Sequence, residues 1–161
     1  MKPPDLSALG ERANRSREQA SRLGQGLILK AYRELYVRSD GRIGANTLGV
    51  PGMLLTTTGR KSGKKYTVAL IYATDGDDLV VVGLNGGGDK NPDWLENLRR
   101  NPAVDVQVGR DKHRSTAEVI DRNDRRYERL WRLVNTNNRG QYYQYQHDTK
   151  RPIPVVLLRP S

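Results

Sequence analysis

Residues 54–70 read LLTTTGRKSGKKYTVAL, which is two strand-like runs joined by a short turn. The second run continues as KYTVALIYA over residues 65–73, and both of its alternating faces are partly apolar. Runs of this kind, bounded by glycine, are typical of paired β-strands. Two glycines and four cations lie in or beside the turn: Gly59, Gly63, Arg60, Lys61, Lys64 and Lys65. The stretch therefore predicts a β-hairpin with a strongly positive turn.

Similar runs recur along the chain and extend this hairpin into a sheet. The expected strands are residues 53–58, 65–73, 79–84, 103–108, 114–121 and 153–158, with a hairpin turn at 75–78. Helical patterns cover residues 23–37, 91–101 and 124–134, and the second helix should have Asn91 as its N-cap and Pro92 at its first position. Six strands with short helices between and after them predict a mainly β fold with α additions, arranged as an antiparallel barrel.

The length of 161 residues suits a single domain, which is expected over residues 23–161. Residues 1–22 are polar and are expected to be disordered or to form a solvated helix. The sequence shows no leader-like apolar segment, and its longest apolar runs are too short to span a membrane. A cytoplasmic protein is therefore expected.

The net charge of +10 is unevenly distributed along the chain. Residues 1–65 hold 13 Lys and Arg against 5 Asp and Glu, a balance of +8, whereas residues 66–161 hold 15 against 13, a balance of +2. A basic front half of this kind favours an anionic partner. Nucleic acid, a membrane surface and a polyanionic cofactor all fit.

The chain has no cysteine and only two histidines. This composition excludes disulfides, thiolate catalysis and cysteine metal sites, and no metal is expected. His113 and His147 have no partner at a recognisable spacing, so both are interpreted as structural or solvated.

The cationic turn suggests three interpretations. A Walker A loop is excluded, because Gly59 and Gly63 enclose only three residues, Lys64 is followed by Lys65, and a strand follows the turn. A solvated hairpin whose charges serve solubility is one alternative. The other is an anion cradle, in which the glycines allow the backbone to approach a phosphate or carboxylate and the cations bind it.

A second motif, VVGLNGGGDKNPDW, covers residues 81–94. Here a buried strand runs into Asn85 and three glycines, and then into the start of a helix. Glycines at such a point allow a flat ring to lie against bare backbone, and the helix dipole adds positive potential. The same residues also fit a plain flexible connector.

These two motifs, together with YQYQHDTKRPIPVVLLRP near the end of the chain, resemble the deazaflavin-dependent nitroreductase and F420H2-dependent quinone reductase family. The resemblance covers roughly residues 27–160. It implies a split β-barrel like that of FMN-binding proteins, coenzyme F420 as the cofactor, and an actinobacterial oxidoreductase that transfers a hydride from the reduced cofactor. The polyanionic tail of F420 would then account for the cations of the turn.

The resemblance also implies residue roles. The turn and the strand after it would bind the cofactor's phosphate, glutamate tail and ring edge: Arg60, Lys61, Ser62, Gly63, Lys64, Lys65, Tyr66, Thr67 and Val68. The next strand would lie along the ring: Val82, Gly83, Leu84 and Asn85. The helix would close the site: Asp93, Trp94, Leu95, Glu96 and Asn97. Tyr142 and Tyr145 would cover the ring where the substrate enters and are the candidate catalytic residues, with Tyr142 also touching the cofactor.

Two departures from the family pattern bear on the substrate. The best-known nitro-drug-activating member has Ser-Lys where this chain has Leu84 and Asn85, and Arg139 stands where another tyrosine would be expected. Quinones or activated enones are therefore the expected substrates, with poor action on nitroimidazoles. The protein is expected to be a monomer or a homodimer.

Two rival interpretations remain open. A basic nucleic-acid-binding module without catalysis would use the cationic first half of the chain, although the sequence has no stacking motif or recognition helix, so no nucleic-acid partner is expected. Peripheral membrane contact through residues 10–36, where cations flank apolar positions, would be compatible with the enzyme and with a lipid-soluble quinone.

Overall fold

The computed structural model describes residues 27–47, 50–85 and 88–161. The polar segment predicted over residues 1–22 and the first residues of the helix predicted from Leu23 lie outside these ranges.

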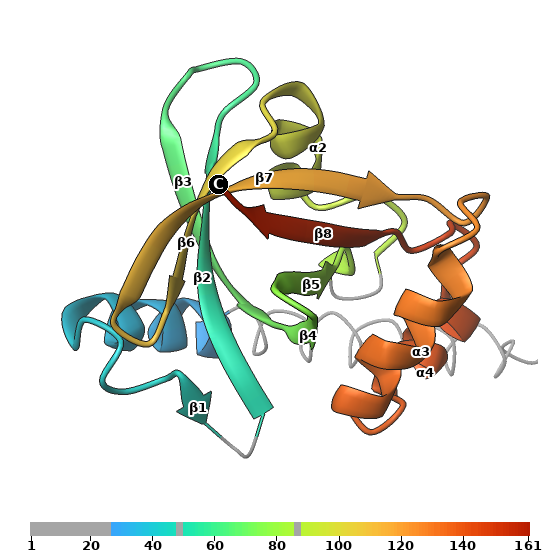
Figure 1. Cartoon of the computed structure of the whole chain (residues 1–161), viewed down its shortest axis with the longest axis horizontal. Helices are drawn as coiled ribbons and strands as arrows, with labels where there is room; N and C mark the ends of the chain where they lie inside the picture. Colours follow the sequence, from blue (N-terminus) through green and yellow to red (C-terminus); the bar gives the residue numbers. More distant parts are fainter. Residues whose placement is uncertain (1–26, 48–49, 86–87) are drawn as a thin grey trace, which may run out of the picture.

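In the described residues, eight antiparallel strands form a strongly curled sheet (Figure 1). They are β1 (Asn46–Thr47), β2 (Val50–Thr58), β3 (Lys65–Ile71), β4 (Ala73–Asp75), β5 (Asp78–Val82), β6 (Ala103–Val108), β7 (Asp111–Ile120) and β8 (Val155–Pro160). The strand order is β1-β2-β6-β7-β8-β5-β4, and β3 pairs with β2. The predicted antiparallel barrel is confirmed, with eight strands in the described residues where the sequence predicts six.

The predicted hairpin is confirmed as β2 and β3. Leu54 pairs with Ala69 and Thr58 pairs with Lys65, so the cationic turn joins the ends of the two strands. The predicted strand over residues 65–73 is divided, because the backbone N–H of Tyr72 donates to Pro51 O at 3.2 Å and β4 leaves to pair with β5. The turn at 75–78 is also confirmed, with Asp75 opposite Asp78.

Four helices accompany the sheet in the described residues: one through residues 27–38, α2 (Asp93–Arg100), α3 (Tyr127–Asn137) and α4 (Gln141–Asp148). Helix α2 begins one residue later than predicted, with Pro92 as N-cap, and the Asn91 amide bonds to Glu96 Oε1 at 2.9 Å instead of capping. Helix α4 was not predicted, because QYYQYQHD has no apolar stripe and only Tyr142 is buried.

Two groups of buried side chains form the core. The first lies inside the barrel under α2 and includes Met53, Leu55, Leu95 and Leu98. The second lies between α3, α4 and the β5–β8 side of the sheet, where Trp131 stacks on Tyr127 at 5.7 Å between ring centroids. Each fully buried apolar side chain contributes roughly 1.5–3 kcal/mol. The second core fixes the position of α4 relative to β5.

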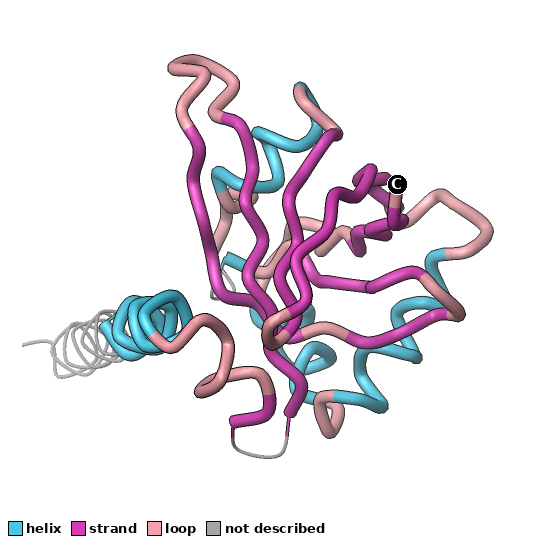
Figure 2. The backbone as a smooth tube through the Cα atoms, turned by 60° about the vertical axis from the view of Figure 1, so that its left-hand side comes forward, coloured by secondary structure: helices cyan, strands magenta, loops and turns pink. Residues whose placement is uncertain are grey.

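The helix through residues 27–38 lies outside the barrel, against β2, β3 and β6 (Figure 2). Its buried residue is Tyr36, whose hydroxyl donates to Gly52 O at 3.1 Å and accepts from the Gly109 N–H at 2.6 Å. The described members of the predicted apolar stripe are exposed: Leu27, Ile28, Ala31 and Leu35. Within the described residues, no helix is long and apolar enough to cross a membrane.

A cationic cavity between the hairpin turn and helix α2

A cavity of about 700 Å³ opens where the β2–β3 turn, the residues after β5 and helix α2 meet. Its walls are Arg33, Gly59, Arg60, Lys61, Ser62, Lys65, Tyr66, Thr67, Val68, Asn85, Pro92, Asp93, Trp94 and Asn97. Four of these residues are cations and one, Asp93, is an acid, so the lining carries a formal charge of +3. A cleft lined by one sign of charge attracts ligands of the opposite sign.

The two sequence motifs thus meet at one place. Eleven of the predicted site residues line the cavity: Arg60, Lys61, Ser62, Lys65, Tyr66, Thr67, Val68, Asn85, Asp93, Trp94 and Asn97. The other predicted residues do not: Gly63, Lys64, Val82, Gly83, Leu84, Leu95, Glu96, Tyr142 and Tyr145. Val82, Gly83 and Leu95 are buried behind the wall. Arg33 was missed, because nothing in its local sequence places the N-terminal helix next to β3.

The turn is a closed loop held by its own backbone. The Gly59 N–H donates to Lys64 O at 2.7 Å, and the Gly63 N–H donates to Gly59 O at 3.0 Å. Gly63 has a φ of +69°, which favours glycine. A Cβ on Gly59 would lie 2.7 Å from both Ser62 Oγ and Tyr66 Cε2, so a larger residue there would force these two side chains to move.

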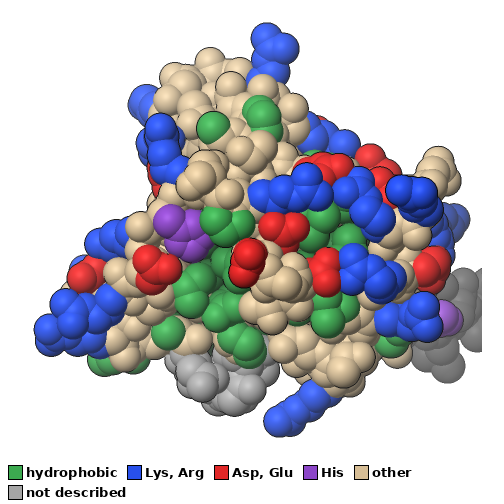
Figure 3. Space-filling model, viewed as in Figure 1, with side chains coloured by type: hydrophobic (Ala, Val, Ile, Leu, Met, Phe, Trp, Pro, Cys, Tyr) green, Lys and Arg blue, Asp and Glu red, His purple; other side chains and the backbone are tan. Residues whose placement is uncertain are grey.

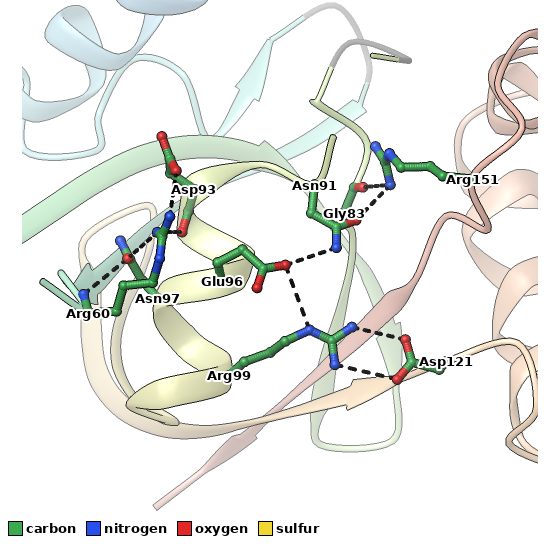
Figure 4. A network of polar contacts seen from close by, with 9 residues as sticks. All are labelled: Arg60, Gly83, Asn91, Asp93, Glu96, Asn97, Arg99, Asp121 and Arg151. Atoms are coloured by element: carbon green, nitrogen blue, oxygen red, sulfur yellow. Dashed lines mark hydrogen bonds and ion pairs between the residues drawn. The ribbon is translucent and has the colours of Figure 1, made fainter. Parts of the chain in front are cut away.

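Arg60 is held across the cavity by helix α2 (Figure 4). The carboxamide oxygen of Asn97 accepts from the Arg60 backbone N–H at 3.2 Å and from Arg60 Nη1 at 3.0 Å. Asn97 is buried, and its amide donates to Thr57 Oγ1 at 3.4 Å. Arg60 Nη2 also lies 3.2 Å from Asp93 Oδ1, but the Asp93 side chain is 89% exposed, so this ion pair is weak.

The lysines of the turn differ in their surroundings. Lys65 Nζ is paired with Asp105 Oδ2 at 3.2 Å, and Arg114 approaches the same carboxylate. Within the described part of the chain, Lys61 and Lys64 have no ion-pair partner. Lys61 is thus an available cation on the cavity wall.

The residues after β5 turn sharply beside the cavity. Asn85 has a φ of +48° and its amide donates to Lys90 O at 2.9 Å. A Cβ on Gly83 would lie 3.1 Å from Leu95 Cδ2 on α2 and from Pro154 Cγ just before β8, so a larger residue would require these neighbours to shift. Beyond this glycine the chain divides its side chains: Asn85 lines the cavity, whereas Leu84 packs against the core beneath α3 and α4.

The two candidate catalytic tyrosines lie on α4, behind this loop. Tyr142 is 6% exposed, packs on Trp131 at 6.2 Å between centroids, and has its pKa raised to about 12 by burial. Tyr145 is half-buried and packs on the same core as Leu84. The structure thus places Tyr142 in the core and Tyr145 at the edge of the core, and neither lines the cavity, so their catalytic roles stay predictions.

A second hollow, of about 490 Å³, lies on the outer face of the sheet and shares only Thr67 with the first. His113 lines this second hollow, and its Nδ1 lies 3.5 Å from Asp111 Oδ2. On the face seen in Figure 1, hydrophobic side chains lie at the centre and charged side chains surround them (Figure 3). In the described ranges, no group of three or more histidines and carboxylates could hold a metal ion.

An antiparallel barrel with a cationic cavity at one edge defines a split-barrel protein suited to an anionic cofactor. Comparison with known proteins is more specific: the pattern of the F420H(2)-dependent quinone reductase family matches residues 28–160. An F420H(2)-dependent quinone reductase of Mycobacterium tuberculosis is 42% identical over 132 residues, which are 81% of this chain and 89% of that protein.

Solved structures agree. An F420-H2-dependent reductase has a TM-score of 0.60 and 36% identity, over 68% of this chain and 94% of that chain. A domain-swapped dimer has a TM-score of 0.62 and 32% identity, over 84% of this chain and 99% of its own. The chain therefore belongs to the F420H(2)-dependent quinone reductase family. This confirms the predicted family, the split-barrel fold, an F420-dependent reductase as the type of enzyme, and coenzyme F420 as its cofactor.

Proposed function

We propose that this protein transfers a hydride from reduced F420 to quinones or activated enones, with the cofactor held in the cavity between the hairpin turn and α2. The observation that carries this proposal is the set of four cations that line one cavity, two of which, Arg60 and Lys61, are neighbours in the turn. Their chemistry matches the phosphodiester and glutamate carboxylates of the cofactor tail.

The described residues fit the two parts of such a cofactor. Arg60, Lys61 and Ser62 would bind the anionic part, while Val68 and Trp94 offer apolar surface and Asn85 a side-chain amide toward a ring system. Arg60 would keep its bonds to Asn97 and exchange Asp93 for the ligand.

When bound, the reduced deazaflavin supplies the hydride, and the protein need only position it. The residues that line the cavity would bind and orient the cofactor. The buried Trp94 side chain would exclude water from one side of the cavity. A proton for the reduced substrate oxygen would come from the Tyr145 hydroxyl or from solvent. Tyr145 is preferred to Tyr142, because the latter is buried in the core.

The substrate class rests on the apolar character of the approach from α4. Leu84 and Tyr145 each pack against the same core cluster, and apolar surface of this kind favours flat conjugated carbonyl compounds over small polar acids. Membrane contact through residues 10–36 stays a prediction, and residues 10–26 of that stretch lie outside the described residues. The nucleic-acid alternative is less favoured, because three of the four cations of the turn line a cavity.

The experiment that tests the substrate class follows the oxidation of reduced F420 with menadione, a cyclic enone and a nitroimidazole in parallel. We expect turnover with menadione or the enone and little with the nitroimidazole. Rapid nitroimidazole reduction without quinone activity would contradict the proposed substrate class. Activity with none of the three would favour cofactor storage or a different substrate.

A further inference from the structure

Arg151, in the connection between α4 and β8, makes an unusual set of contacts with the loop after β5. Its Nη2 donates to Leu84 O at 2.7 Å and its Nε donates to Gly88 O at 2.9 Å. Its Nη1 donates to Gly83 O at 3.1 Å and to Asn91 Oδ1 at 3.0 Å (Figure 4). Four of the five N–H donors of a guanidinium are thus used on one loop.

All four acceptors are uncharged: three backbone carbonyls and one carboxamide. Within the described residues Arg151 is in no ion pair, and its half-buried position lowers its pKa despite the attraction of Asp89. Half-burying a cation costs desolvation free energy, and here four hydrogen bonds to uncharged acceptors, with no ion pair in the described residues, offset that cost. What Arg151 offers is a planar fork that fixes several carbonyls at once.

The contacts of Arg151 reach the cavity on one side. Leu84 precedes Asn85, which lines the cavity. Asn91, held by Arg151 through its oxygen, donates through its nitrogen to Glu96 Oε1 at 2.9 Å on α2. The same helix carries Asn97, the residue that orients Arg60.

On the other side, Gln146 of α4 is hydrogen-bonded to the connection between α4 and β8. Its Nε2 donates to Arg151 O at 3.0 Å, and its Oε1 accepts from the Ile153 N–H at 2.8 Å. The helix that carries Tyr145 is therefore tied to the backbone of Arg151, and the Arg151 side chain is tied to the loop that leads into the cavity wall at Asn85.

We propose that Arg151 is a positioning residue that fixes residues 83–85 and 88–91 against helix α4, so that the cofactor wall and the substrate side of the site keep one geometry. The inference rests on the proposed function. It assigns Arg151 no contact with cofactor or substrate.

The test compares Arg151→Gln and Arg151→Lys with the control Arg159→Gln, in the full-length protein. Arg159 lies on β8 and forms ion pairs with Asp78 and Glu118 away from the cavity. Three quantities are measured: the F420 dissociation constant by cofactor fluorescence, amide exchange of residues 83–85 and 88–91 without cofactor, and the thermal midpoint. KM and kcat for menadione are then separated.

We expect Arg151→Gln to weaken F420 binding about tenfold or more and to raise exchange in the loop. Arg151→Lys keeps the charge but not the fork, so it should fold and still lose several-fold in affinity. Gln146→Ala should raise KM for menadione while F420 affinity changes by less than about twofold, because its contacts lie on the α4 side. Arg159→Gln should leave both constants near those of the wild type.

Unchanged affinity and loop exchange in Arg151→Lys and Arg151→Gln would overturn the inference, as would an equal loss in Arg159→Gln. If Arg151→Gln fails to fold, the lysine variant decides. If the wild type itself does not bind F420, the proposed function fails, and loop exchange in the cofactor-free variants still judges whether Arg151 holds the loop.

Discussion

Asn97 connects the core to the cation at the centre of the site. It is buried, so its amide has a fixed orientation, and both bonds from Arg60 end on its oxygen. Arg60 therefore reaches the cavity in a defined geometry, whereas Lys61 is exposed and free to move. Geometry of this kind makes a charge-assisted bond specific as well as strong.

Replacing Arg60 by Ala should weaken F420 binding by about 1.5–3 kcal/mol, since a charge-assisted contact at a partly buried site is lost. Replacing Lys61 by Ala should cost less, on the order of 1 kcal/mol or below, because the side chain is exposed. Fluorescence titration measures both. Arg114→Ala, at an exposed position outside the cavity, is the control. Normal binding in both turn variants would mean that the turn is only a solvated hairpin.

Helix α4 carries three tyrosines, and two of them, Tyr142 and Tyr145, differ in their surroundings. Tyr142 supports the core by packing on Trp131, while Tyr145 is half-buried at the edge of that core. Tyr142→Ala should therefore lower the free energy of unfolding by about 3–5 kcal/mol.

Tyr145→Phe should slow turnover with menadione and leave the thermal midpoint almost unchanged, if its hydroxyl assists protonation. Tyr142→Phe serves as the matched control and should keep near wild-type turnover, because its hydroxyl is buried away from the cavity. Equal turnover in the two Phe variants would mean that solvent, and not Tyr145, supplies the proton to the reduced substrate.

The sequence predicted most of the sheet and one side of the site, and the reasons are physical. The β2–β3 hairpin has strand-forming runs and a glycine turn, which are local signals. Helix α4 lacks such a signal, because its position depends on a single buried tyrosine and on Gly140, whose φ of +77° separates it from α3. Arg33 and Arg151 contact residues that lie 34 and at least 60 positions away in the sequence, and no local pattern encodes such contacts.

At the scale of the whole molecule, ion pairs join α3 to the sheet and give stability a defined pH dependence. Arg126 Nη2 lies 2.6 Å from Glu118 Oε1 on β7 and 2.8 Å from Asp124 Oδ2. Hydrogen bonds from Arg126 lower the pKa of both carboxyls, that of Asp124 from 3.8 to about 2. The folded state therefore binds fewer protons than the unfolded chain between these two pH values.

This part of the stability is fully present above the ordinary carboxyl pKa and is lost as the pH falls from about 4 toward about 2. The thermal midpoint of the wild type should therefore decrease as the pH is lowered from about 4 to about 2. Arg126→Gln should lower the midpoint at neutral pH and flatten its decrease in acid. A variant with the same acid profile as the wild type would show that Arg126 does not set these pKa values.

Titration of the purified protein with F420 and with FMN determines whether the cavity between the hairpin turn and α2 selects F420. We expect tight binding of F420, weaker binding of a form without the glutamate tail, and weak or absent binding of FMN, because four cations line the cavity. An FMN affinity equal to or greater than that of F420 would show that the cavity does not select F420.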